Sequence, residues 1–284
     1  MRAPVPPRPT PVSLHLQDFP LPRAQRAVLI VHGLGEHMGR YQHMADWFNQ
    51  RGYSVRGYDH YGHGHSPGPR GSITDNNMLL DDLRTQFHDY QSELGYSPIL
   101  LGHSMGGLVA AAAVTTGWVQ PRALVLSSPA LRTWISPSVQ LLAHVLALTV
   151  PDVPLWQRLP NHKLSHDPQV TPTFLADPLR HGRMTPRLAY FLMRGGREVL
   201  AKAACLQIPT LLLVAGEDEL VDPSGSRDFA AAAPPSLVTL HEFPGLYHEL
   251  FNEAEPARSE VLNELAIWLK SLETRYPARM VASR

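Results

Sequence analysis

The sequence is poor in cysteine, since its 284 residues include only Cys205. One cysteine cannot form an internal disulfide, so the chain shows no sign of a disulfide framework and needs no oxidising compartment. A lone cysteine beside a predicted strand is more often a small core residue than a nucleophile. We therefore expect Cys205 to be buried and inert.

An excess of charge is also missing, because Lys and Arg total 25 and Asp and Glu total 25. Phosphate binding needs a basic surplus, so the composition argues against a nucleic-acid partner. No run approaches the ~18 apolar residues that span a bilayer. Residues 1–11 contain five prolines and no apolar segment of the secretory kind, which predicts a flexible tail. We expect a cytoplasmic protein.

Apolar runs and helical patterns alternate along the rest of the chain. Strands are predicted at residues 27–31, 53–58, 99–101, 123–126, 209–214 and 238–243. Helices are predicted at residues 41–50, 76–94, 105–116, 223–233 and 256–272. Such alternation is typical of a mostly parallel sheet flanked by helices. Residues 12–17 alternate apolar and polar side chains, which indicates an antiparallel edge strand.

Residues 132–203 interrupt this alternation with eight prolines and no convincing strand. We interpret them as an inserted cap of short helices joined by proline turns. The α/β core is then predicted to comprise residues 12–131 and 204–284.

The pentapeptide from Gly102 to Gly106 matches the G-x-S-x-G nucleophile elbow, with Ser104 at its centre. An apolar strand precedes it and a helix of small residues follows, which is the context that the motif requires. Glycines on either side of the serine let neighbouring segments approach the turn. The pattern predicts an α/β-hydrolase fold with Ser104 as the nucleophile.

A serine nucleophile needs a base and an orienting carboxylate. In this fold both follow the serine, with the acid before the histidine. Asp218 and His248 each follow a predicted strand, so they should reach the same sheet edge as Ser104. Glu217 and Asp222 are alternative acids, although Asp222 fits better as a cap for the next helix.

The oxyanion of the tetrahedral intermediate needs two preorganised N–H donors. One is expected from Met105, the residue after the nucleophile. The other is expected from Leu34, in the glycine-containing loop after the strand at 27–31. These two donors would complete a serine-hydrolase site.

A metal site is a weaker interpretation of residues 59–66, which include His60, His63 and His65. Three histidines could bind zinc, but no fourth ligand lies nearby. We expect them to pin the loop by hydrogen bonds, and we expect no metal or other cofactor.

Further motifs extend over about residues 27–270. They are residues 32–37 with 39–41, 59–66 with 68 and 70–71, 102–107, 160–161, 164–165, 167–168, 177–179, 216 with 218, 247–249 and 252–253. Together they resemble the monoacylglycerol lipase and lysophospholipase group of α/β-hydrolases, the serine aminopeptidase-like set.

The resemblance implies the same triad and the same oxyanion donors. It also implies a cap over an acyl-chain pocket with a polar end for a glycerol head group. Glu36 and Arg40 match motif positions near that end, so they are candidate head-group residues, with anchoring of the loop as the alternative.

We therefore expect a serine hydrolase that cleaves carboxylic esters, foremost monoacylglycerols or similar lipid monoesters. The alternatives are a lysophospholipase, a general carboxylesterase or acyltransferase, and a ligand-binding receptor on a hydrolase scaffold. Residues 139–148 of the cap are apolar on more than one face. They could line the acyl pocket, touch a membrane surface transiently or pack on the core.

Overall fold

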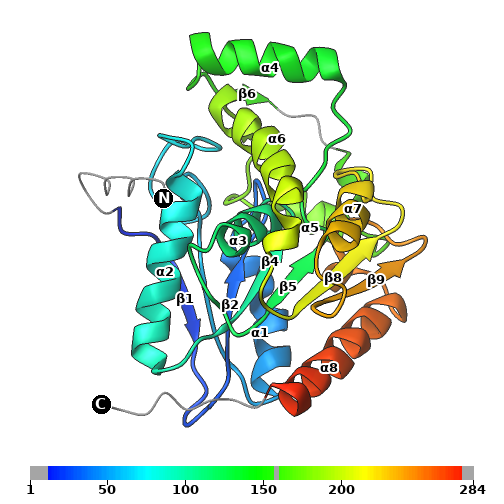
Figure 1. Cartoon of the computed structure of the whole chain (residues 1–284). Coiled ribbons are helices and arrows are strands. Elements are labelled where there is room, and N and C mark those ends of the chain that lie inside the picture. The colour runs from blue at the N-terminus through cyan, green and yellow to red at the C-terminus, as the bar shows by residue number, and fades with distance from the viewer. Residues whose placement is uncertain (1–11, 157–159, 277–284) are drawn as a thin grey trace.

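A seven-stranded sheet forms the centre of the computed structural model, which describes residues 12–156 and 160–276 (Figure 1). The tail predicted at residues 1–11 lies outside the described residues. The strand order is β1-β3-β2-β4-β5-β8-β9, with β1 antiparallel to β3 and every other pair parallel. The strands are β1 (Leu16–Phe19), β2 (Ala27–Val31), β3 (Ser54–Tyr58), β4 (Ile99–His103), β5 (Leu124–Ser127), β8 (Thr210–Ala215) and β9 (Val238–Phe243). The expected antiparallel edge strand is present, but it begins at Leu16 instead of residue 12.

Helices cover both faces of this sheet. One face packs against α2 (Met78–Leu94), α3 (Met105–Thr115), α6 (Pro186–Ala201) and α7 (Ser224–Ala232), and the other packs against α1 (Gln42–Asn49) and α8 (Ala257–Arg275). Strand β2 shows why the sequence contains unbroken apolar runs. Leu29 points into the first layer and Ile30 into the second, so both faces of the strand are buried.

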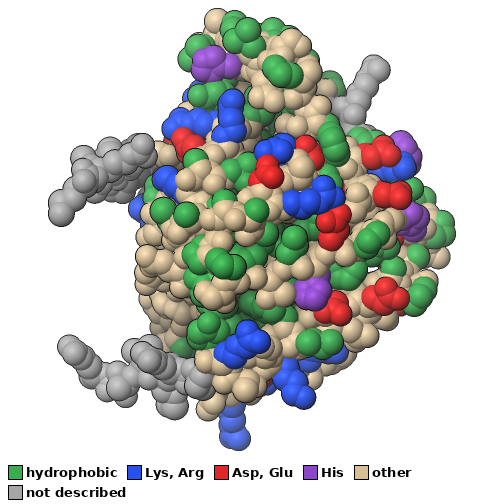
Figure 2. Space-filling model, turned by 45° about the vertical axis from the view of Figure 1, so that its right-hand side comes forward, with side chains coloured by type: hydrophobic (Ala, Val, Ile, Leu, Met, Phe, Trp, Pro, Cys, Tyr) green, Lys and Arg blue, Asp and Glu red, His purple; other side chains and the backbone are tan. Residues whose placement is uncertain are grey.

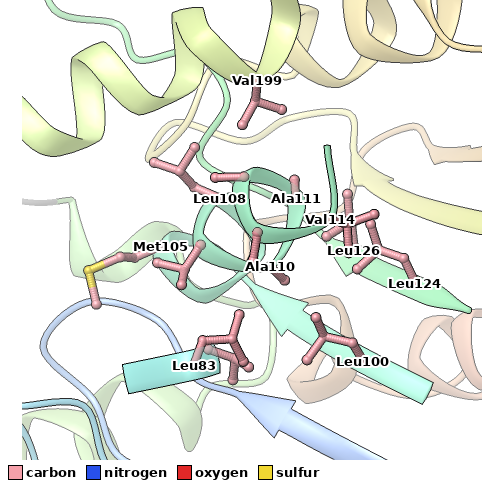
Figure 3. Packing of buried hydrophobic residues seen from close by; sticks show 14 of the residues in the cluster. Leu83, Leu100, Met105, Leu108, Ala110, Ala111, Val114, Leu124, Leu126 and Val199 are labelled. Carbon is pink, nitrogen blue, oxygen red and sulfur yellow. The ribbon is translucent and has the colours of Figure 1, made fainter. Parts of the chain in front are cut away.

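Helix α3 lies at the centre of the larger core cluster. Figure 3 shows Leu108, Ala111 and Val114 among side chains of the sheet and of α6. All eleven residues of α3 are buried, which explains its small, apolar composition. Helix α3, which directly follows Ser104, is thus fixed on all sides.

Residues 132–203 hold α4 (Pro137–Thr149), the 3-10 turn η2 (Asn161–Lys163), α5 (Val170–Ala176) and α6. They also contain an antiparallel pair that the sequence analysis did not predict, β6 (Leu155–Trp156) with β7 (Arg183–Met184). Two residues per strand are too few to produce a recognisable alternation. Helix α6 shares the core cluster with α3, whereas α4 lies across the outer end of the molecule (Figure 1).

The prediction of a buried Cys205 is wrong, because its side chain is exposed. Cys205 ends the 3-10 turn η3 (Ala203–Cys205), in which Ala203 is buried, and the next residue, Leu206, is buried as well. The turn therefore directs Ala203 and Leu206 inward and leaves Ala204 and Cys205 outside.

Candidate active site

Ser104 lies between β4 and α3 with φ of 52° and ψ of −119°. A positive φ is strained for a residue with a Cβ, and such strain is typical of functional turns. The turn passes so close to the strand β2 that a Cβ at Gly106 would overlap the carbonyl oxygen of Val31. Glycine is therefore required there, and Ser104 is lifted to the sheet edge, partly exposed.

The structure brings Asp218 and His248 together at this edge. The Oδ2 atom of Asp218 lies 2.6 Å from Nδ1 of His248, and both side chains are buried. Oδ1 of Asp218 accepts the backbone N–H groups of Leu220 and Val221 at 2.8 and 3.0 Å. Burial alone would lower the pKa of His248, but the Asp218 carboxylate outweighs it, and the pKa is raised. The carboxylate is thus held rigidly against an imidazole whose cationic form it favours.

The alternative acids lie elsewhere. Glu217 is exposed. Oδ1 of Asp222 accepts the N–H of Ser224, the first residue of α7, at 2.9 Å. Asp222 therefore supports the start of a helix, as its sequence position suggested.

Ser104, His248, Leu34 and Met105 line one cavity of about 280 Å³. The N–H groups of Leu34 and Met105 have no hydrogen-bond partner among the described residues, so both are free to donate to a ligand. The Ser104 hydroxyl also has no partner there. In ligand-free sites the bond between nucleophile and base is often long and shortens on binding.

Most of the cavity wall is apolar and comes partly from the cap. The apolar lining residues are Leu34, Met105, Ala130, Trp134, Ile135, Leu164, Phe174, Met184, Leu192, Leu220 and Val221. The segment 139–148 is not part of the wall, and no residue of α4 is buried. Of the three roles considered for this segment, pocket lining is therefore the one that the geometry does not support.

Glu36 and Arg40 also border the cavity, but their polar atoms are bonded to protein. Oε1 of Glu36 accepts the Gly33 N–H at 2.6 Å and the Tyr41 hydroxyl at 2.7 Å, and Oε2 pairs with Arg40 at 2.6 Å. Arg40 in turn holds Glu249 through two 2.7 Å bonds. The contacts support loop anchoring, the alternative considered for these residues. In the sequence Glu249 stands out only as a motif position, although an acid directly after the predicted base His248 is a signal.

Hydrogen bonds pin the loop of residues 59–66, but the expectation that its histidine side chains make them is wrong for His60, whose two ring nitrogens have no partner among the described residues. Asp59 accepts the N–H groups of Met38 and His65 at 2.7 and 2.8 Å, and the Ser66 hydroxyl donates to the Asp59 carbonyl at 2.6 Å. Within residues 12–156 and 160–276, no group of three or more His, Cys, Asp or Glu side chains is placed to hold a metal ion.

The sheet order, the strained serine turn and the neighbouring acid and histidine define an α/β-hydrolase. The model of the family described as "Serine aminopeptidase, S33" matches residues 22–255. A monoacylglycerol lipase of Mycolicibacterium smegmatis is 35% identical over 248 residues, which are 86% of this chain and 88% of that protein. A monoglyceride lipase of Rattus norvegicus is 28% identical over 250 residues, covering 85% of this chain and 81% of that protein.

Solved structures agree. The crystal structure of monoacylglycerol lipase from Paleococcus ferrophilus has a TM-score of 0.83 and 33% identity, covering 92% of this chain and 99% of that chain. The chain therefore belongs to the serine aminopeptidase S33 family, as the motifs indicated. It is a hydrolase of the lipase and esterase class.

Proposed function

We propose that this protein hydrolyses carboxylic esters of the monoacylglycerol type through an acyl-enzyme. The observation that carries the proposal is the 2.6 Å pair of Asp218 and His248 at the cavity that Ser104 also lines. The names of the relatives, which are monoacylglycerol or monoglyceride lipases, supply the substrate class. The apolar wall suits an acyl chain.

In the first step His248 takes the proton of the Ser104 hydroxyl, and Oγ attacks the ester carbonyl. The N–H groups of Leu34 and Met105 stabilise the oxyanion. His248 then protonates the departing alcohol oxygen. Water, activated by the same imidazole, resolves the acyl-enzyme, while Asp218 stays ionised and holds the imidazole tautomer.

The test of this mechanism is Ser104→Ala, assayed with p-nitrophenyl esters and labelled with a fluorophosphonate probe. We expect a loss of at least ~10³-fold in kcat and no labelling. Ser259→Ala, at an exposed serine of α8, is the matched control and should keep both. Labelling or turnover that survives in Ser104→Ala would overturn the assignment. An unlabelled wild type without turnover would favour a receptor.

Chain length and head group need a second assay. We propose comparing monoacylglycerols, lysophospholipids and p-nitrophenyl esters of the same acyl chains, from two carbons upward. Higher kcat/KM for monoacylglycerols supports the proposed substrate. Higher kcat/KM for lysophospholipids would identify a lysophospholipase, and higher kcat/KM for short esters of any alcohol would identify a general carboxylesterase. Faster transfer of the acyl group to an added alcohol than to water would identify an acyltransferase.

We further propose that α4 contacts a lipid surface transiently. Its exposed face presents Val139, Leu141, Leu142, Val145 and Leu148, with Leu141 65% and Leu148 72% exposed. Helix α4 contains no Lys, Arg, Asp or Glu, and Figure 2 shows none of these at the end of the molecule where α4 lies in Figure 1. No described helix is long and apolar enough to cross a membrane. We therefore expect α4 to touch the lipid surface through these apolar side chains without spanning it.

Sedimentation with phosphatidylcholine vesicles tests this contact. The double variant Leu141→Ser and Leu148→Ser should lose ~2 kcal/mol of binding, roughly 30-fold. Ile267→Ser is the matched control, because Ile267 is 62% exposed on α8, at another part of the surface. Equal binding of all forms, or an equal loss with Ile267→Ser, would refute the role of α4.

A further inference from the structure

Glu249 follows His248 directly and is buried against Arg40. Its two carboxylate oxygens accept from Nη1 and Nη2 of Arg40, each at 2.7 Å, and Oε2 also accepts from Asn252 at 2.8 Å. The side chains of Glu249 and Arg40 are 5% and 13% exposed. Two parallel charge-assisted bonds in a buried setting fix the direction of both groups.

Arg40 extends this contact to the other side of the site. Its Nη1 donates to Oε2 of Glu36, whose Oε1 accepts the backbone N–H of Gly33, the residue before Leu34. A continuous series of charged contacts therefore joins the loop that carries the base to the loop that carries an oxyanion donor. In sequence these loops are more than 200 residues apart.

We propose that Glu249 is a positioning residue which, through Arg40 and Glu36, holds His248 and the oxyanion loop in their mutual geometry. The proposal rests on the catalytic roles of Ser104 and His248 proposed above. Productive geometry must be held within a fraction of an ångström, and buried supporting contacts are the means of doing so.

The charge balance of the network adds an electrostatic effect. Two carboxylates share one guanidinium, so one negative charge remains in excess near His248. The charged or titratable groups acting on His248 are Asp218, Glu249 and Glu36 on the acidic side, with the His103 ring 4.8 Å away. Burial lowers the pKa of His103 to about 4, so this ring stays neutral during turnover. Glu249 therefore supports Asp218 in stabilising the imidazolium that forms when Ser104 loses its proton.

The bonding also separates this role from head-group recognition. Every carboxylate oxygen of Glu36 and Glu249 already accepts at least one hydrogen bond from the protein. Both hydrogens of Nη1 of Arg40 are used by the two acids. These contacts favour a positioning role, because moving either acid to bind a glycerol hydroxyl would break a buried ion pair, which is costly.

The experiment compares Glu249→Gln with wild type on two esters of one fatty acid, a monoacylglycerol and a p-nitrophenyl ester. We expect kcat to fall about 10–100-fold for both esters, with KM changed less than about threefold. Loss of a negative charge disfavours the imidazolium, so the acidic limb of the kcat/KM profile should move to lower pH. Glu36→Gln tests the same contacts from the other end. Because both acids act through Arg40, the double variant should lose less than the product of the single losses.

Glu93→Gln is the matched control. Glu93 makes the same two-pronged contact with Arg56, which also pairs with Asp18, but none of these residues lines the cavity. The Glu93→Gln variant should change only the melting temperature and leave kcat, KM and the pH profile unchanged. Unchanged kinetics and pH profile in both Glu249→Gln and Glu36→Gln would overturn the proposal. A rise in KM confined to the monoacylglycerol would also overturn the proposal, because it would show that these residues bind the head group. Activity surviving in Ser104→Ala would instead show that the proposed function itself has failed.

Discussion

Replacement of His181 by Gln should weaken the loss of stability that this protein suffers in mild acid. His181 belongs to residues 132–203, and its ring lies 4.5 Å from that of His63 in the loop after β3. Burial, aided by the nearby Arg70 and His32, lowers the pKa of His181 to about 4. The neutral ring is therefore the form that the folded protein accommodates.

The sign and size of this change in stability follow from the pKa of His181 in the folded and unfolded states. The folded pKa lies below the ordinary value of 6.5, so the unfolded chain binds the proton more strongly and stability falls as pH drops below about 6.5. Between about pH 7.5 and about pH 5.5, one such histidine removes ~1 kcal/mol. The pKa values of His60, His63 and His103 are also lowered strongly by burial. These three groups therefore add to the loss of stability in the same direction. His248, whose pKa is raised, opposes part of this loss.

Urea unfolding at several pH values between about 7.5 and 5.5 measures the effect. Wild type should lose stability as the pH falls over this range, and His181→Gln should lose ~1 kcal/mol less. His88→Asn, at an exposed position of α2, controls for the loss of any histidine and should follow wild type. A stability of wild type that is flat with pH, or an identical slope in His181→Gln, would refute the reasoning.

Three further predictions concern the site. Asp218→Asn should lower kcat by ~10³–10⁴-fold while Asp222→Asn costs little activity, and the reverse order in an ester assay would show that Asp222 is the acid. Gly106→Ala should destabilise the protein by ~3 kcal/mol in urea unfolding, because its Cβ would overlap the Val31 carbonyl oxygen; a change below ~1 kcal/mol would contradict this packing. Trp134→Phe removes the 3.1 Å hydrogen bond from Nε1 to the Asp218 carbonyl, so kcat should fall several-fold while the melting temperature changes little. Unchanged steady-state kinetics would contradict this prediction.

The core of the fold could be predicted from sequence because its signals are local. Apolar runs such as Ala27–Val31 are buried on both faces, and this single fact determines their composition. The site residues could be placed because parallel strands end at one sheet edge, so Asp218 and His248 had to lie near Ser104. Neither inference needed knowledge of the loops between them.

What could not be predicted depends on contacts between distant segments. The pair β6–β7 joins residues 155–156 to 183–184 with too few residues for any periodicity. The exposure of Cys205 is decided by a 3-10 turn, not by its apolar neighbours. Glu36 and Arg40 match motif positions, yet only their contact with Glu249, over 200 residues away, reveals what they bond to.

Contacts between distant segments also attach the cap, residues 132–203, to the loops of the site. His181 donates its N–H to the Gly35 carbonyl at 3.0 Å, and Glu249 donates its N–H to the Leu164 carbonyl at 2.8 Å. Trp134 bonds to the Asp218 carbonyl. Segments of residues 132–203 therefore hold the loops that carry Leu34, His248 and Asp218, the proposed oxyanion donor, base and acid. A cap attached to all three loops cannot open as an independent lid without disturbing the proposed catalytic groups, so we expect substrate entry and catalytic geometry to be coupled.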